Sequence, residues 1–202
     1  MEAPVSPTEA PIEAVPPAPI PPELSRRMKL LREIVDTAIL TAVVFLLVNA
    51  ATSRFQIESV SMQPSLFEGE RLIVDKISYR LGAPQRGDIV VFTIVGEPKD
   101  LIKRVIGLPG DTIEIAEGVV YIDGLRLDEP YVELRSGDAY SARKLGTDEY
   151  FVMGDNRGNS RDSRVFGPIQ LSSIVGRAWL IYWPVANLGL VPRPAYASGD
   201  AR

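Results

Sequence analysis

The sequence predicts a mainly β protein, an antiparallel β-sheet domain preceded by one N-terminal transmembrane helix. Two observations carry this prediction. A single long apolar run, residues 34–52, lies near the start of the 202-residue chain. After it, short β-rich runs alternate with turns of Gly, Pro and Asp, and no helical period persists over ten residues. Many short strands with frequent turns are typical of closed or coiled antiparallel sheets.

Residues 1–25 are rich in Pro, Ala and Glu, with proline pairs at 16–17 and 21–22. Proline lacks the N–H that helices and sheets need, and the segment offers few apolar side chains for burial. We therefore expect a disordered, proline-rich cytoplasmic tail.

Residues 26–52 are expected to form a basic flank and a membrane anchor. A helix over 34–52 would span about 28 Å, close to the ~30 Å hydrocarbon core of a bilayer. The basic cluster lies only on the N-terminal side, so the positive-inside rule predicts a single-pass protein of the cell membrane with a cytoplasmic N-terminus. Two alternatives stay open, a buried core helix and a signal peptide cleaved near Val48-Asn49-Ala50.

Residues 53–191 are expected to form the extracytoplasmic all-β domain, and residues 192–202 a flexible tail. Apolar and β-branched runs bounded by Gly, Pro and Asp mark the strands. The predicted strands are 71–76, 89–95, 101–106, 112–115, 119–122, 150–153 and 174–183.

Two residue types are missing, and each absence excludes a class of chemistry. The chain has no histidine, which excludes a Ser-His-Asp triad and histidine metal sites, and no cysteine, which excludes thiol nucleophiles and zinc clusters. The net charge of −4 gives no indication of nucleic-acid binding. We expect no metal and no cofactor. Covalent catalysis would have to use Ser, Thr, Lys, Tyr or a carboxylate.

Ser61 is the candidate nucleophile. It lies between an extended apolar entry, Phe55 and Ile57, and the turn at Pro64. A serine is a weak nucleophile unless a base removes its proton. Without histidine, the base would be a lysine or a carboxylate.

Lys103 is the candidate base among five lysines, because it lies inside the apolar strand 101–106. Strand alternation sends Lys103 and Arg104 to opposite faces, so one of them must face inward. Burial lowers a lysine pKa from ~10.4 by up to 3–5 units, which arginine cannot match. A solvated Lys103 beside a paired Arg104 remains the alternative.

Four blocks of the sequence resemble type I signal peptidases, the membrane-anchored serine–lysine leader peptidases of peptidase family S26. The blocks are Ser59–Leu66, Arg86–Phe92, Lys103–Asp111 and Gly154–Arg164, in the order of that family and behind one N-terminal apolar run. The resemblance covers roughly residues 35–184. It implies a β domain of the signal-peptidase and repressor-cleavage type, and an enzyme that removes signal peptides from exported preproteins at the membrane surface.

The resemblance implies roles for individual residues. Ser61 would be the nucleophile, and Lys103 the general base that later protonates the leaving amine. Ser59 would hold the oxyanion beside the Ser61 backbone N–H. Ser160 would hydrogen-bond the lysine amine.

A further group of residues would shape the site. Asp162 and Arg164 would form a structural ion pair that holds the Ser160 loop. Asp155, Asn156 and Arg157 would shape the same loop and take no part in the chemistry.

The implied substrate is an extended signal peptide with small residues at positions −3 and −1 from the cut. It could pair with a strand beside Ser61 and be selected by shallow apolar pockets. Candidate pocket residues are Phe55, Ile57, Met62, Ile102 and Val105, with core packing as the alternative for each. The lipid bilayer is the other expected partner, which Trp179, Tyr182 and Trp183 could contact.

Two other functions fit the same sequence. The chain could be a membrane-tethered β domain that binds peptides without catalysis. It could also use the Ser-Lys pair for another task, such as processing a pilin-like protein or cleaving a repressor.

Overall fold

The computed structural model describes residues 22–134, 136–194 and 196 of the chain, which divides into two compact units at Phe45 and Leu46. Residues 1–21 of the expected proline-rich tail lie outside the described residues. Helix α1 covers Pro22–Ala51, so residues 22–25, which were assigned to the tail, are helical.

Within α1, residues Arg26–Ala51 are long and apolar enough to cross a membrane, and no other helix in the described ranges is. Leu40, Phe45 and Leu47 each expose more than 60% of their surface. A core helix would bury such side chains, whereas a helix in lipid keeps them on its outer face. The helix is therefore consistent with the predicted anchor.

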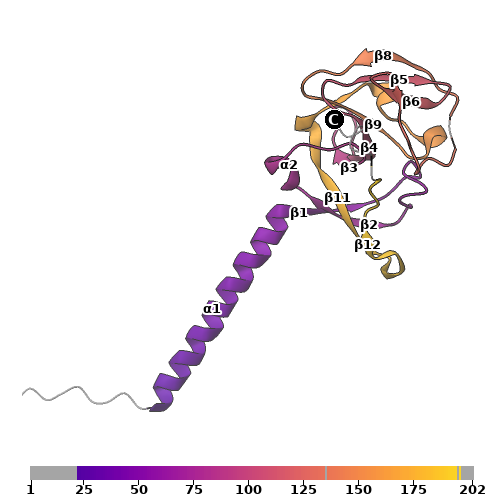
Figure 1. The fold of residues 1–202 in the computed structure, drawn as a ribbon. Coiled ribbons are helices and arrows are strands. Elements are labelled where there is room, and N and C mark those ends of the chain that lie inside the picture. The colour runs from indigo at the N-terminus through magenta and orange to yellow at the C-terminus, as the bar shows by residue number, and fades with distance from the viewer. Residues whose placement is uncertain (1–21, 135, 195, 197–202) are drawn as a thin grey trace, which may run out of the picture. The chain divides into compact units, whose positions relative to one another are not determined.

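The unit Leu46–Arg202 is built on antiparallel sheets (Figure 1). The larger sheet has the order β1-β2-β11-β3-β4-β9-β10, with β12 paired to β11. Its strands are β1 (Thr52–Gln56), β2 (Arg71–Asp75), β3 (Ile89–Phe92), β4 (Leu101–Gly107), β9 (Glu149–Met153), β10 (Ile169–Gln170), β11 (Ile174–Trp183) and β12 (Gly189–Leu190).

A second sheet follows β4 in the sequence and has the order β7-β6-β5-β8. Its strands are β5 (Thr112–Ala116), β6 (Val119–Ile122), β7 (Leu125–Arg126) and β8 (Tyr140–Lys144). The remaining elements are short helices and 3-10 turns: α2 (Ser78–Leu81), η1 (Arg157–Asn159), α3 (Ser163–Phe166), η2 (Leu171–Ser173) and η3 (Val185–Asn187). The predicted mainly β, antiparallel fold class is confirmed.

Strand β4 lies between β3 and β9 and is buried on both faces. Ile102 packs in a core cluster with Met62 and Leu72, which we call the first core. Ile106 packs with Ile113 in a second core under the smaller sheet. Because β4 is covered on both sides, Lys103 and Arg104 are both buried, 4% and 0% exposed.

Three described residues of the predicted flexible tail 192–202 contact the domain, namely Pro192, Arg193 and Tyr196. The Val191 N–H donates to Trp179 O over 3.0 Å, and Pro192 O accepts from Arg104 Nη1 over 3.3 Å. Tyr196 packs against the second core. Composition alone suggested a loose end, but tertiary contacts hold this segment. Residues 195 and 197–202 lie outside the described ranges.

Candidate active site

Ser61 lies on a turn that follows β1 and is fastened to the first core. The Leu66 N–H donates to Met62 O over 2.9 Å and closes the turn. The Met62 and Leu66 side chains are fully buried in the first core. Because two buried side chains hold the turn, Ser61 has a defined position with 5% of its surface exposed.

Lys103 reaches Ser61 from β4. Its Nζ lies 2.7 Å from Ser61 Oγ and 2.8 Å from Ile102 O. Ser59 Oγ lies 3.2 Å from Ser61 Oγ. When the amine is neutral, the 2.7 Å contact lets the Ser61 hydroxyl donate to Nζ, which is the geometry of a nucleophile and its general base.

The environment of Lys103 favours the neutral amine. Burial lowers the pKa of Lys103 from 10.5 to about 8, against the opposing effect of the Asp162 and Asp155 carboxylates. At pH 8 about half of the amine is therefore free to accept a proton. The alternative in which Lys103 is solvated is excluded by its 4% exposure.

We expect a pH-dependent reaction rate if Lys103 is the base. Below a pKa of about 8 the neutral fraction falls tenfold for each pH unit, so kcat/KM should rise with pH and level off above about 8. The measurement is peptide cleavage by the full chain in detergent from pH 6 to 10. A flat profile, or a midpoint near 10.5, would contradict a buried lysine base.

The matched control for this profile is Lys99→Gln. Lys99 is exposed and pairs with Glu58, so its loss should leave the midpoint unchanged. A shifted midpoint in Lys99→Gln would mean that the profile reports general surface charge.

The loop after β9 contains the ion pair between Asp162 and Arg164. Arg164 Nε donates to Asp162 Oδ1 and Nη2 to Oδ2, both over 2.8 Å. Asp162 Oδ2 also accepts from the Gly154 N–H over 3.0 Å. Burial raises the pKa of Asp162, but these hydrogen bonds from Arg164 and Gly154 outweigh it and lower the pKa overall. The carboxylate thus stays ionised and fastens this loop to the end of β9.

Ser160 does not make the hydrogen bond to Lys103 that the sequence led us to expect. Its Oγ is buried and meets no hydrogen-bond partner within the described part of the chain, although it is near enough to Asp162 to help lower the pKa of that carboxyl. The Lys103 amine instead donates to Ser61 and to Ile102 O, which use two of its donors. The role of Ser160 stays a prediction.

Asn156, which the sequence assigned only to shaping its own loop, and Gly154, which the sequence left unassigned, hold the nucleophile turn. The Asn156 N–H donates to Ser61 O over 3.0 Å, and Asn156 Nδ2 donates to Val60 O over 3.2 Å. A Cβ on Gly154 would lie 2.6 Å from Ser61 O and 2.3 Å from Ser160 Oγ. The nucleophile turn and the loop that carries Ser160 therefore both pack against Gly154, and they can do so because this residue has no side chain.

Arg104 lies behind the same turn. Its Nε and Nη2 donate to the two carboxylate oxygens of Asp155 over 2.8 and 2.7 Å, and Nη2 donates to Ser65 Oγ over 3.1 Å. Both members of the ion pair are at most 1% exposed. A buried bidentate pair of this kind fixes geometry, and removing one member leaves the other charge unpaired.

Within the described residues, four buried arginine–carboxylate pairs lie in the domain that carries Ser61 and Lys103. In each pair both side chains are less than a tenth exposed. The pairs are Arg86–Asp111, Arg104–Asp155, Arg157–Glu129 and Arg164–Asp162.

The five candidate pocket residues do not form one pocket. Ile57, Met62 and Ile102 are at most 3% exposed and belong to the first core, against which Phe55 packs. Val105 packs in a third cluster with Val90 and Phe92. Residues 102 and 105 are three apart on one strand and face opposite ways, so they cannot line the same pocket wall. The assignment of substrate-pocket residues stays a prediction.

An open pocket of about 390 Å³ adjoins the part of the turn that comes after Ser61 in the sequence. It is lined by Gln63, Pro64, Phe67, Glu133, Leu134, Asp155 and Asn156. None of the five candidate residues lines it.

Comparison with known proteins gives a consistent result. Residues 30–183 match a family described as signal peptidase, peptidase S26. A probable signal peptidase I-2 of a Synechocystis species is 44% identical over 141 residues, which is 67% of this chain and 65% of that protein. Signal peptidase I of Leptolyngbya laminosa is 43% identical over 149 residues, 69% of this chain and 73% of the relative. Signal peptidase IB of Staphylococcus aureus is 32% identical over 179 residues, 80% and 93% of the two chains.

Proposed function

This chain belongs to the signal peptidase family, peptidase S26, and from that premise we propose that it is a signal peptidase I that cleaves signal peptides with a Ser61–Lys103 dyad. The single observation that carries the assignment of the dyad is the 2.7 Å contact between Lys103 Nζ and Ser61 Oγ in a buried setting. A hydroxyl beside an amine whose pKa lies near 8 is poised for deprotonation.

The reaction begins when neutral Lys103 takes the proton of Ser61 as its Oγ attacks the scissile carbonyl. The bond from Oγ to carbon forms, and the carbonyl oxygen becomes an oxyanion. The Ser61 N–H and the Ser59 hydroxyl stabilise it, since fixed donors close to a developing charge lower the barrier. No described residue accepts a hydrogen bond from the Ser61 N–H, and Ser59 Oγ lies 3.2 Å from Ser61 Oγ.

The intermediate then collapses. The carbon–nitrogen bond breaks, and the Lys103 ammonium gives its proton to the leaving amine, the new N-terminus of the mature protein. A water molecule, deprotonated by Lys103, then attacks the acyl carbon. The bond from carbon to Ser61 Oγ breaks, the signal peptide leaves with a new carboxyl end, and the Lys103 ammonium returns the proton to Ser61 Oγ. One lysine thus serves both steps.

Signal peptidases I act at membranes, and α1 is consistent with an anchor. In our proposal the basic N-terminal flank is cytoplasmic and the β domain lies outside. The exposure of Trp179 and Trp183, 45% and 51%, supports contact between this domain and the bilayer interface.

The preference for small residues at positions −3 and −1 is carried over from the family. It is supported by the apolar surroundings of Ser61, where Ile57 and Met62 already fill the core beneath the turn. Shallow space above such a core would exclude large side chains.

The test is cleavage of an Ala-X-Ala signal peptide by the purified full chain in detergent, with the cut located by mass spectrometry. We expect one cut after the second Ala, and covalent labelling of Ser61 by a β-lactam-type serine inhibitor. Ser61→Ala should show neither. A wild type that binds the peptide but neither cleaves it nor takes the label would favour a non-catalytic peptide-binding domain.

A further inference from the structure

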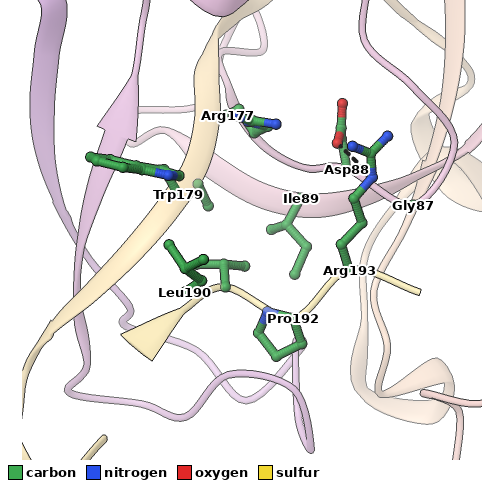
Figure 2. Close-up of a pocket in the computed structure, with 10 residues that line it drawn as sticks. Gly87, Asp88, Ile89, Arg177, Trp179, Leu190, Pro192 and Arg193 are labelled. Atoms are coloured by element: carbon green, nitrogen blue, oxygen red, sulfur yellow. Dashed lines mark ion pairs between the residues drawn. The ribbon is translucent and has the colours of Figure 1, made fainter. Parts of the chain in front are cut away.

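The segment Gly189–Pro194 together with Tyr196, which we call the strap, crosses the face of the domain that carries β11. Figure 2 shows Leu190 and Pro192 of the strap beside Trp179 and Ile89 around a pocket of about 280 Å³, and Arg193 extending towards Asp88. Arg193 Nε lies 3.4 Å from Asp88 Oδ1. The strap is therefore tied to both β11 and the start of β3.

The strap passes close to Gly87. A Cβ at this position would lie 2.8 Å from Tyr196 Cε2 and 3.0 Å from Pro194 Cγ. Because Gly87 has no side chain, Tyr196 and Pro194 can lie directly against its backbone, and a larger residue there would displace them.

Two members of the strap enclose Arg104. Pro192 O accepts from Arg104 Nη1 over 3.3 Å. The Tyr196 hydroxyl lies 3.0 Å from the Tyr131 hydroxyl, and the Tyr131 ring lies over the guanidinium, 4.2 Å from Cζ to the ring centroid. Tyr196 thereby holds the ring that covers Arg104.

Arg104 in turn contacts the segments that hold the nucleophile. It pairs with Asp155, and the next residue, Asn156, donates its N–H to Ser61 O. It also donates to Ser65 Oγ on the nucleophile turn. A continuous series of contacts therefore runs from Tyr196 to Ser61.

We propose that the strap positions the nucleophile, with Tyr196 as a positioning residue that acts through Tyr131 and Arg104. This proposal rests on the proposed function, because its kinetic readout is peptide cleavage by Ser61. A small displacement of a reacting group lowers the turnover rate more than it lowers substrate affinity. Loss of the strap contact should therefore act on kcat.

The experiment compares Tyr196→Ala and Tyr196→Phe with the wild-type full chain. Tyr196→Ala removes the ring and should lower kcat about tenfold while KM changes less than about twofold. Tyr196→Phe keeps the ring but loses the hydroxyl contact with Tyr131, so it should show a smaller loss of kcat and a smaller increase in Asn156 exchange than Tyr196→Ala. Hydrogen exchange of the Asn156 amide, which is bonded to Ser61 O, should be faster in Tyr196→Ala.

Tyr140 provides the matched control. It packs against the same second core, with its ring edge to face on Phe151 at 4.9 Å, and it has no contact with Arg104. Tyr140→Ala should lower thermal stability but leave kcat and the Asn156 exchange rate unchanged.

Two results would overturn the proposal. One is a folded Tyr196→Ala chain with wild-type kcat and wild-type Asn156 exchange, and the other is a Tyr140→Ala chain with the same loss of kcat as Tyr196→Ala. If Tyr196→Ala does not fold, unchanged Asn156 exchange in Tyr196→Phe overturns it. A wild-type chain that does not cleave at all would refute the proposed function and not the role of the strap. In that case the hydrogen exchange of the Asn156 amide would still show whether the strap positions the nucleophile turn.

Discussion

Replacing Lys103 by Met should reduce signal peptide cleavage by on the order of a thousandfold or more, because the Ser61 hydroxyl loses the amine that lies 2.7 Å away and would take its proton. Methionine has nearly the same length and fills the same buried space, so the loss would reflect the missing amine. The measurement is single-turnover cleavage of an Ala-X-Ala peptide by the full chain in detergent.

The same substitution should make the protein more stable at neutral pH. The fall of the Lys103 pKa from 10.5 to about 8 corresponds to a cost of about 3 kcal/mol for burying the ammonium. The folded pKa is the lower one, so this cost is present in full below about pH 8 and disappears as the pH rises through the unfolded value near 10.5. Lys103→Met should therefore unfold at a higher temperature at pH 7, with a gain that shrinks towards pH 10.

Lys99→Met is the control for both effects. Lys99 is 71% exposed, so its replacement should change neither cleavage nor stability by a comparable amount. The assignment of Lys103 as base would be refuted by retained cleavage in Lys103→Met. A Lys103→Met chain that lost both cleavage and stability at pH 7 would also contradict the assignment, because the loss of cleavage could then come from unfolding.

Gly154→Ala should lower cleavage by about a hundredfold and the free energy of unfolding by about 1–3 kcal/mol. A Cβ there would lie 2.6 Å from Ser61 O and 2.3 Å from Ser160 Oγ, so the nucleophile turn and the Ser160 loop would both have to move. The displacement would break the alignment of Ser61 with Lys103. Cleavage kinetics and urea unfolding of the same samples measure the two effects.

Gly158→Ala is the matched control in the same loop. A Cβ at Gly158 meets nothing within 4 Å, so this variant should keep wild-type cleavage and stability. Equal losses in the two variants would show that the loop tolerates no side chain at any glycine. Wild-type behaviour of Gly154→Ala would mean that the two segments can separate without consequence.

The strands that could be predicted are the ones with contiguous apolar runs, since such runs must be buried. Strand β11 begins and ends where the sequence predicted, at residues 174 and 183. Strands β1 and β8, Thr52–Gln56 and Tyr140–Lys144, were not predicted. Each lies at the edge of its sheet, is mostly polar and has no fully buried residue. Hydrogen bonding to one neighbouring strand therefore defines it, and no apolar pattern marks it in the sequence.

The candidate site was predictable where one residue type decided the chemistry. The absence of histidine directed attention to lysine, and the apolar strand around Lys103 indicated burial. Gly154 and Asn156 gave no comparable signal, because their importance comes from contacts with residues 60 and 61, far away in the sequence. Tyr196 was missed for the same reason, since a proline-containing terminal segment looks loose until its partners are known.

The four buried arginine–carboxylate pairs have a consequence for how the protein handles protons. An enzyme that depends on a neutral lysine works best on the alkaline side, where ion pairs built on lysine would begin to lose their charge. The arginine side chain keeps its charge through the alkaline range, so the framework around Ser61 stays paired while Lys103 releases its proton. Scaffold and base thus differ in the kind of cation they use, and one proton can leave the centre of the site without loosening these pairs.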